Sequence, residues 1–570
     1  MTNPAEKPGL APPNRMVDPI EMLARILDLL LLVVAPVLIP AAVLGFLAAP
    51  IAYDTMHLQD TFFFAELGWR VLNGFEPVID FGHFYGGVIA HVVAWAFQLF
   101  GVTLKSIDYA FVMLLCPVLA LTGLVAWRRL STFSALALVL IVSACLLARI
   151  PMEELTAVQH GVFAHSFVYN RFACALAVAL TIFALIPGQR AGIELSAALL
   201  CGVACYLMVL TKPTFVTFPL FFLIALGLTG RLRSLLAAVA GTVVTMALID
   251  FGAVRVLGAF DYAVSAGGNH VSLLDLMMKA VGVFLVHPLE VLLVLGGAAV
   301  VIARRQPGTV PLVLAALALT AGYAGMTATM GWRGDIGQQT LPFLATLMIG
   351  LHETVRQDGR SGPVLGDGLK IPAALMAIAF AAPLLVHSIA GSIAATLRAP
   401  LVVPTGTPLD TYLAWSGDFR GAGGRVLDTP VPAEERTAAA LAHLEAGLPL
   451  DVGVEYAMIL DGIALLQKMP DIQERRIVGD YGVFAFLMQT RPVAGFPAWV
   501  SATAPQFAGS DDPLADADLV ILHRTPLSAE TGLVRDRMGT DFTLCETSAF
   551  WELHIRSGGT GICDRLGDRS

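Results

Sequence analysis

Long apolar stretches recur along the chain up to about residue 395, and no other feature constrains the fold as strongly. A helix needs about 20 consecutive apolar residues to cross a bilayer. The stretches that reach or approach this length are 26–51, 108–127, 132–149, 171–187, 192–211, 213–229, 234–257, 277–303, 309–330, 338–353 and 371–395. A shorter one, 84–101, carries His91. Residues 21–395 are therefore predicted to form an all-α polytopic membrane domain with about 11–13 transmembrane helices.

The composition agrees with a membrane protein and argues against several classes of function. Of the 570 residues, 56% are hydrophobic and 14% are charged, whereas soluble domains are about one-quarter charged. The net charge of -9, without a basic cluster, argues against a nucleic-acid partner. No Walker A loop supports ATP-driven transport, and no Cys-x-x-Cys or His-Glu-x-x-His motif indicates a zinc site.

Lysine and arginine in the short loops predict the orientation of the chain in the membrane. The loops that this bias places in the cytoplasm hold Arg128-Arg129, Arg190, Arg231 with Arg233, Arg304-Arg305, and Arg356 with Arg360. Residues 1–20 are then a disordered cytoplasmic tail, and 52–107 are the first extracytoplasmic loop. In that arrangement 84–101 is a re-entrant or interfacial helix, and the alternative is a full crossing that violates the rule later in the chain. We expect a multi-pass protein of a bacterial inner (plasma) membrane.

Residues 396–570 differ from the rest, because charge rises and the apolar runs shorten. Helices are predicted at 433–448, 461–469 and 528–538, and strands at 456–460, 475–479, 518–522, 541–545 and 550–556. This alternation predicts an extracytoplasmic α/β domain. Cys545 and Cys563 both belong to it, and the sequence leaves open whether they form a disulfide or two free thiols.

The stretch 56–87, directly after the first span, contains several polar residues among aromatic residues and glycines. Apolar residues at helical spacing in 60–73 predict an amphipathic helix on the membrane surface. Asp60 stands at the start of this helix, where N-terminal N–H groups stabilise a carboxylate. A role as helix cap alone is the alternative to a chemical role for Asp60.

The same stretch resembles the GT-C superfamily, polytopic glycosyltransferases that use polyprenyl-phosphate-linked sugars, such as mannosyltransferases and aminoarabinose transferases. The residues that carry the resemblance are Asp60-Thr61, Phe64, Gly68, Gly74, Pro77-Val78, Asp80-Phe81, Gly86-Gly87 and Leu99-Phe100-Gly101. Thr61 replaces the frequent second acid, which weakens the case for a two-carboxylate metal site. Gly86-Gly87 replaces a pair that usually bears proline.

The resemblance implies that Asp60 is the general base of an inverting transfer. A sugar hydroxyl is a poor nucleophile, and a nearby carboxylate can take its proton in the transition state. The leaving polyprenyl phosphate is anionic and needs cations or N–H donors. Lys212, Arg333 and Arg171 lie in or beside predicted extracytoplasmic loops and are the candidate cations. For each, the alternative is a helix-end residue that reaches to the interface.

Asp80 and His83 are predicted to orient the acceptor or the Asp60 region, although a lone aspartate in a loop is also typical of a turn. The predicted function is transfer of a sugar from a polyprenyl-phosphate donor to an extracytoplasmic cell-envelope glycan or glycolipid, with the lipid tail in an apolar groove between spans. No metal or other cofactor is required by the sequence, and a divalent metal stays open.

Two other functions compete with this prediction. A transporter or flippase of lipid-linked saccharides needs polar residues deep inside the spans, whereas here the polar clusters lie at one side of the membrane. A non-catalytic envelope assembly protein could keep the same scaffold.

Overall fold

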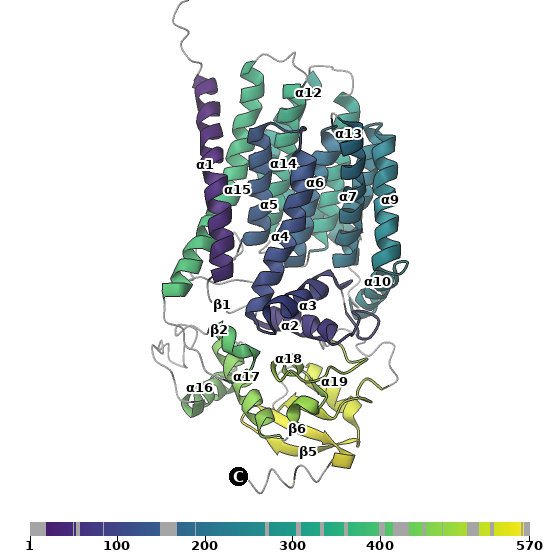
Figure 1. Cartoon of the computed structure of the whole chain (residues 1–570), viewed down its shortest axis with the longest axis vertical. Coiled ribbons are helices and arrows are strands. Elements are labelled where there is room, and N and C mark those ends of the chain that lie inside the picture. The colour runs from purple at the N-terminus through teal and green to yellow at the C-terminus, as the bar shows by residue number, and fades with distance from the viewer. Residues whose placement is uncertain are drawn as a thin grey trace, which may run out of the picture.

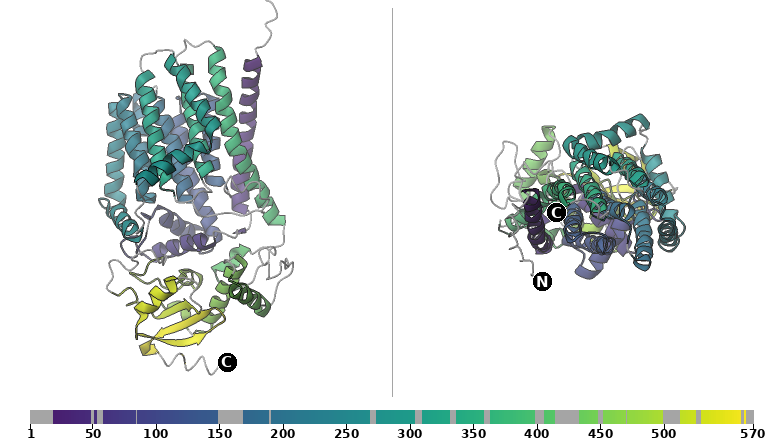
Figure 2. Two further views of the ribbon diagram at one scale, coloured as in Figure 1. Left: turned by 180° about the vertical axis from the view of Figure 1, so that it is seen from behind. Right: turned by 90° about the horizontal axis from the view of Figure 1, so that it is seen from above.

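The computed structural model describes residues 19–48, 51–52, 58–83, 85–148, 168–188, 190–267, 273–303, 309–330, 336–357, 363–397, 405–413, 433–447, 452–469, 471–498, 512–524, 529–559 and 563. These residues form a tall bundle of helices and a smaller C-terminal region that contains a sheet (Figures 1 and 2). We call the end of the bundle that faces the C-terminal region the proximal end and the opposite end the distal end. The first residues of α1 lie at the distal end (Figure 1).

All eleven predicted spans are helical. The helices are α1 (Pro19–Ala48), α4 (Lys105–Ala126), α5 (Thr132–Leu147), α6 (Val168–Leu185), α7 (Ala191–Thr211), η2 (Pro213–Val216) with α8 (Thr217–Leu228), α9 (Leu232–Ile249), α11 (Leu273–Leu285) with α12 (Pro288–Ala303), α13 (Thr309–Ala328), α14 (Ile336–Gln357) and α15 (Pro363–Leu397). Among the described helices, seven are long and apolar enough to cross a membrane, or eight if the bent pair α11–α12 is one span. The predicted multi-span helical fold is confirmed, and the chain is a multi-pass membrane protein.

Two predicted spans are not single straight helices. The segment 234–257 breaks after Ile249, and α10 (Val254–Gly267) starts a separate helix. The segment 277–303 breaks before Pro288, and the two halves meet at 85°. Proline has no N–H to continue the preceding helix, and it fits the first turn of a new one. Both segments were predicted as spans from their apolar composition, which does not indicate where a helix breaks.

Glycines allow α7 and α9 to approach closely. A Cβ atom on Gly202 would lie 1.9 Å from the carbonyl oxygen of Ala238, and one on Gly241 would lie 2.1 Å from that of Leu199. Both positions therefore need glycine for this backbone contact, as is common where membrane helices pack.

Two helices lie between the bundle and the C-terminal region, α2 (Leu58–Leu72) and α3 (Val88–Phe100) (Figure 1). The 13 residues of α3 extend about 20 Å, which is shorter than the hydrocarbon core of a bilayer, in agreement with a helix that does not cross. The helix predicted at 60–73 is present as α2. Every residue from 61 to 70 is buried, so this part of α2 has no solvated face, and its expected place on the membrane surface stays a prediction.

The C-terminal region contains a four-stranded mixed sheet in the order β3-β4-β6-β5, in which β3 and β4 are parallel and the other pairs antiparallel. Its elements are α16 (Ala433–Glu445), α17 (Val452–Gln467), β3 (Ile477–Gly479), α18 (Phe484–Leu487), β4 (Leu519–His523), α19 (Ala529–Met538), β5 (Phe542–Thr547) and β6 (Trp551–Arg556). A short parallel pair, β1 (Ile51–Ala52) with β2 (Tyr412–Leu413), also links the two parts of the chain.

One predicted strand of this region is wrong. Residues 456–460 belong to α17, in which every residue from 454 to 460 is buried. A short apolar run that is buried on all sides does not distinguish a strand from a helix. The question about the two cysteines is answered, because Cys545 and Cys563 form a disulfide.

Candidate functional site

The structure describes some of the predicted site residues and not others. Asp60 is the third residue of α2, and its side chain lies outside the described part of the chain. Arg333 also lies outside the described residues. Asp80, His83, Arg171 and Lys212 are described, all at or near the proximal end of the bundle.

Lys212 directly follows α7 at the proximal end. Its Nζ donates to the carbonyl oxygen of Thr329, at 3.0 Å, and lies 5.6 Å and 5.5 Å from the ring centroids of Tyr169 and Phe215. No carboxylate in the described ranges forms an ion pair with it. Desolvation lowers the pKa of Lys212 from 10.5 to about 8. An anion that binds beside the Lys212 ammonium would stabilise it, because the opposite charge offsets the lost hydration.

His83 is buried in an aromatic environment in the loop between α2 and α3. Its ring centroid lies 5.5 Å from that of Phe63 and 5.1 Å from that of Tyr85. Burial lowers the pKa of His83 from 6.5 to about 3, and the nearby charge of Arg70 lowers it further in the same direction. The imidazole is therefore neutral at physiological pH. Its Nδ1 atom has no hydrogen-bond partner among the residues described.

Aromatic side chains connect His83 to Lys212. We call Phe63, Phe64, Tyr85 and Tyr169 the aromatic bridge. The rings of Tyr85 and Tyr169 lie 4.6 Å apart, and Tyr169 in turn faces Lys212. Phe64 of α2 lies 6.5 Å from Tyr169. The structure thus brings His83, Lys212 and the helix of Asp60 to one place, although they are far apart in the sequence.

The other two described candidates make contacts of a different kind. The Oδ2 atom of Asp80 accepts from the backbone N–H of Glu76 at 2.6 Å, which is the turn interaction that the sequence left as the alternative. Arg171 is buried in α6 and donates through Nη1 to the carbonyl oxygen of Ala148, at the end of α5.

The sequence analysis did not identify the buried pair Glu66–Arg70 on α2. The Nε of Arg70 lies 2.8 Å from Glu66 Oε1, and both side chains are almost fully buried. Arg70 Nη1 also donates to the carbonyl oxygen of Phe496 at 2.6 Å, and the N–H of Phe486 donates to Glu66 Oε2 at 3.1 Å. The pair therefore joins α2 to the C-terminal region. An i, i+4 acid–base pair in sequence usually indicates a solvated helix face, so its role was not visible.

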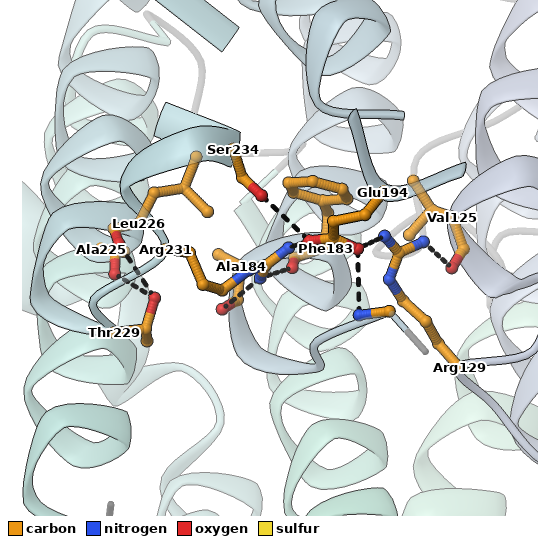
Figure 3. Close-up of polar contacts among 11 residues, drawn as sticks. Val125, Arg129, Phe183, Ala184, Glu194, Ala225, Leu226, Thr229, Arg231 and Ser234 are labelled. Atoms are coloured by element: carbon orange, nitrogen blue, oxygen red, sulfur yellow. Dashed lines mark hydrogen bonds and ion pairs between the residues drawn. The ribbon is translucent and has the colours of Figure 1, made fainter. Parts of the chain in front are cut away.

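Another buried charged cluster lies at the distal end, where Glu194 of α7 pairs with Arg129 and Arg231 (Figure 3). The N–H of Gly188 donates to Glu194 Oε2 at 3.0 Å. The guanidinium groups lie over the ring of Phe183, at 4.7 Å for Arg129 and 4.5 Å for Arg231. One carboxylate thus holds together the ends of several helices, and we interpret this cluster as structural.

The described residues do not form a metal site. No group of three or more His, Cys, Asp or Glu side chains in the described ranges is placed to hold a metal ion. The side chain of Asp60 is not among the side chains that the structure describes. The position after it is Thr61, which offers a hydroxyl where a second carboxylate would strengthen metal binding.

This chain is similar to known proteins in structure but not in sequence. No protein-family model matches the chain, and no curated protein matches it. Two crystal structures of ArnT from Cupriavidus metallidurans are similar at 12% sequence identity. The structure in the apo state has a TM-score of 0.42 and covers 95% of this chain and 99% of its own. The structure bound to undecaprenyl phosphate has a TM-score of 0.41 and covers 93% and 98%. Similarity at this level transfers no residue role to this chain.

Proposed function

We propose that this protein is a membrane glycosyltransferase that moves a sugar from a polyprenyl-phosphate donor to a hydroxyl of an extracytoplasmic glycan or glycolipid. In this proposal Lys212 binds the phosphate of the donor, and Asp60 is the general base. The acceptor enters near His83. The lipid tail of the donor lies along the apolar surface of the bundle.

The observation that carries the proposal is the environment of Lys212. Its ammonium is desolvated at the end of a membrane bundle, with aromatic faces and a carbonyl oxygen around it but no paired carboxylate among the described side chains. A phosphate is a strong partner for such a group, because a charge-assisted hydrogen bond would restore the interactions lost on desolvation. A lipid-linked phosphate also reaches the end of the bundle from the membrane without leaving it.

Helical spacing supports Asp60 as the partner of Lys212 in the reaction. Residues four apart on a helix share a face, so Asp60 belongs to the same face of α2 as Phe64, whose ring lies near Tyr169 in the aromatic bridge. A carboxylate there is suitable to remove the proton from a sugar hydroxyl while Lys212 stabilises the departing phosphate. Arg333 follows Thr329, the hydrogen-bond partner of Lys212, by four residues in the sequence and is proposed as a further phosphate ligand.

Two features support an extracytoplasmic location for the proximal end. The arginines of the Glu194 cluster lie at the distal end, and positive residues favour the cytoplasmic side. The disulfide between Cys545 and Cys563 lies in the C-terminal region, and disulfides persist in oxidising compartments.

The proposal is tested with purified protein in lipid nanodiscs and with radiolabelled polyprenyl-phosphate sugars. Asp60→Asn should abolish transfer, because an amide cannot accept the proton. Lys212→Met should lower the transfer rate by about 10²–10³-fold, the usual cost of one lost electrostatic contact to a leaving group. Lys468→Ala serves as the control, since Lys468 is exposed in the C-terminal region and should not affect transfer.

A parallel measurement separates the two competing functions. Envelope glycans of cells with the wild-type gene, with Asp60→Asn and without the gene are compared by mass spectrometry. The same missing sugar in the last two strains supports transfer. A normal glycan in the Asp60→Asn strain, with the protein at normal levels, would contradict a catalytic role and favour an assembly protein. Accumulation of the complete lipid-linked saccharide on the cytoplasmic side would favour a flippase.

A further inference from the structure

Only the first four residues of the helix α10 (Val254–Gly267) belong to the predicted span 234–257. It starts after the turn 250–253, in which Phe251 and Ala253 have positive φ angles of 46° and 76°. This turn ends α9, and α10 lies beyond the end of α9, at the level of α2 and α3 (Figures 1 and 2). The chain therefore stays at the proximal end of the bundle here.

The inner face of α10 is occupied by contacts with the protein. Arg255 Nη2 lies 2.6 Å from Glu76 Oε2 in the loop between α2 and α3, and the Arg255 side chain is nearly buried. The N–H of Arg255 donates to Asp250 Oδ1 at 2.7 Å, so Asp250 caps the helix.

Close packing adds to these polar contacts. A Cβ atom on Gly258 of α10 would lie 2.4 Å from Val78 Cγ1, and one on Gly82 would lie 2.4 Å from the ring of Tyr262. Arg255, Gly258 and Tyr262 of α10 therefore all lie against the loop between α2 and α3, which carries His83.

The outer face of α10 is apolar and uncovered. Val254, Leu257 and Phe260 recur at intervals of three residues and are 49%, 59% and 50% exposed. Phe251, before the helix, is 69% exposed, and Leu248 at the end of the spanning helix α9 is 75% exposed. The apolar surface thus continues without interruption from a transmembrane helix onto α10, as far as the exposed Asp261.

This pattern is the reverse of that of a helix exposed to water, in which the charged face points outward. An apolar stripe continuous with the lipid-facing surface of α9 matches the boundary between headgroups and acyl chains. We propose that α10 is an interfacial membrane helix whose outer face contacts lipid, and that through Arg255 and Glu76 it braces the loop of His83 from the membrane side. This inference rests on the multi-span architecture and does not depend on the proposed transfer reaction.

Tryptophan fluorescence tests the lipid contact. Phe260→Trp and Leu257→Trp are each placed in nanodiscs made of phosphatidylcholine and phosphatidylglycerol with bromine at the 6,7 or the 11,12 positions of one acyl chain. The contribution of the native tryptophans is removed by subtracting the wild-type protein in the same lipid. Both variants should lose most of the added signal, and the 6,7-brominated lipid should quench more strongly than the 11,12-brominated lipid.

Two reference positions calibrate this result. Val243→Trp, on the exposed side of α9 and well inside the span, should be quenched at least as strongly by the 11,12-brominated lipid. Leu544→Trp, which is 55% exposed on β5 in the C-terminal region, should not be quenched. The proposal is overturned if both α10 variants behave like Leu544→Trp, since α10 would then face water or another protein. Gel filtration of each variant verifies that the protein is folded.

Discussion

The two buried charged clusters at opposite ends of the bundle use carboxylates in different ways. At the distal end, Glu194 binds two arginines from other parts of the bundle, all within residues 129–231. At the proximal end, Glu66 and Arg70 belong to one helix, and their remaining hydrogen bonds go to the backbone of Phe486 and Phe496, more than 400 residues away. The distal cluster closes the bundle on itself, whereas the proximal pair joins the bundle end to a separate part of the chain.

This difference bears on the candidate site. The contacts of the Glu194 cluster that the structure describes all lie within the bundle. At the proximal end, Glu66 and Arg70 of α2, the helix that carries Asp60, are hydrogen-bonded to the C-terminal region. Removing each cluster should therefore have a different consequence, and the following four experiments are ordered by the size of the expected effect.

Glu194→Ala should cause the largest loss of stability. It leaves Arg129 and Arg231 buried near each other without their counter-charge, and breaking a buried ion pair from one side costs about 3–5 kcal/mol. Thermal unfolding of the whole protein in detergent, followed by circular dichroism, measures this loss. Glu434→Ala removes an exposed carboxylate from α16 and is the matched control. An unchanged unfolding temperature in Glu194→Ala would show that the cluster does not hold the bundle.

Arg70→Ala should cost about 3 kcal/mol, by the same mechanism, but mainly at the contact with the C-terminal region. We expect protease to cleave the C-terminal region faster in this variant than in the wild type, at temperatures where the bundle remains helical. Glu66→Gln combined with Arg70→Met should restore part of the stability, because no uncompensated charge stays buried. If Arg70→Ala unfolds the bundle as Glu194→Ala does, the proposed contrast between the two ends is incorrect.

His83 should make the proximal end sensitive to acid. Its pKa is about 3 in the folded protein and 6.5 in the unfolded chain, so between these values the unfolded chain binds more protons. The stability that His83 contributes should therefore be complete above pH 6.5 and fall as the pH decreases, by about 2 kcal/mol at pH 5. His83→Phe keeps an aromatic ring in place and should flatten this part of the curve. Equal pH dependence of unfolding in the wild type and in this variant would refute the assignment.

Trp69→Phe should have the smallest effect. It removes the hydrogen bond from the indole N–H to the carbonyl oxygen of Thr490, which is 2.8 Å long and buried. A net loss of about 1 kcal/mol is expected, again at the contact between α2 and the C-terminal region. The protease assay used for Arg70→Ala measures it. Trp95→Phe is a suitable control because Trp95 is 52% exposed and its indole forms no hydrogen bond with the residues that the structure describes.

Local sequence patterns were sufficient for the elements with strong periodicity or sustained apolar character. The eleven apolar stretches are all helical, and each of the ranges 475–479, 518–522, 541–545 and 550–556 overlaps one of the four strands of the sheet. The helix after the first span was predicted from the spacing of its apolar residues. These features depend on residues that are close together in the sequence, so they can be predicted from the sequence alone.

The failures occurred where distant contacts outweigh local pattern. Residues 456–460 have the composition of a strand, but packing inside the C-terminal region places them in α17. The pair Glu66–Arg70 has a spacing typical of a solvated helix face, yet both side chains are buried against the backbone of Phe486 and Phe496. Likewise, the break before α10 depends on a turn stabilised by Asp250 and on contacts with Glu76.

The sequence by itself determined that this chain crosses the membrane many times and that a smaller mixed region follows, because hydrophobicity over about 20 residues decides partition into lipid regardless of what lies elsewhere. The tertiary structure alone decided that the aromatic bridge connects His83 with Lys212 and that the helix of Asp60 is hydrogen-bonded to the C-terminal region. These arrangements bring together residues more than 100 positions apart in the sequence. The free energy of such long-range contacts depends on the packing of the whole fold.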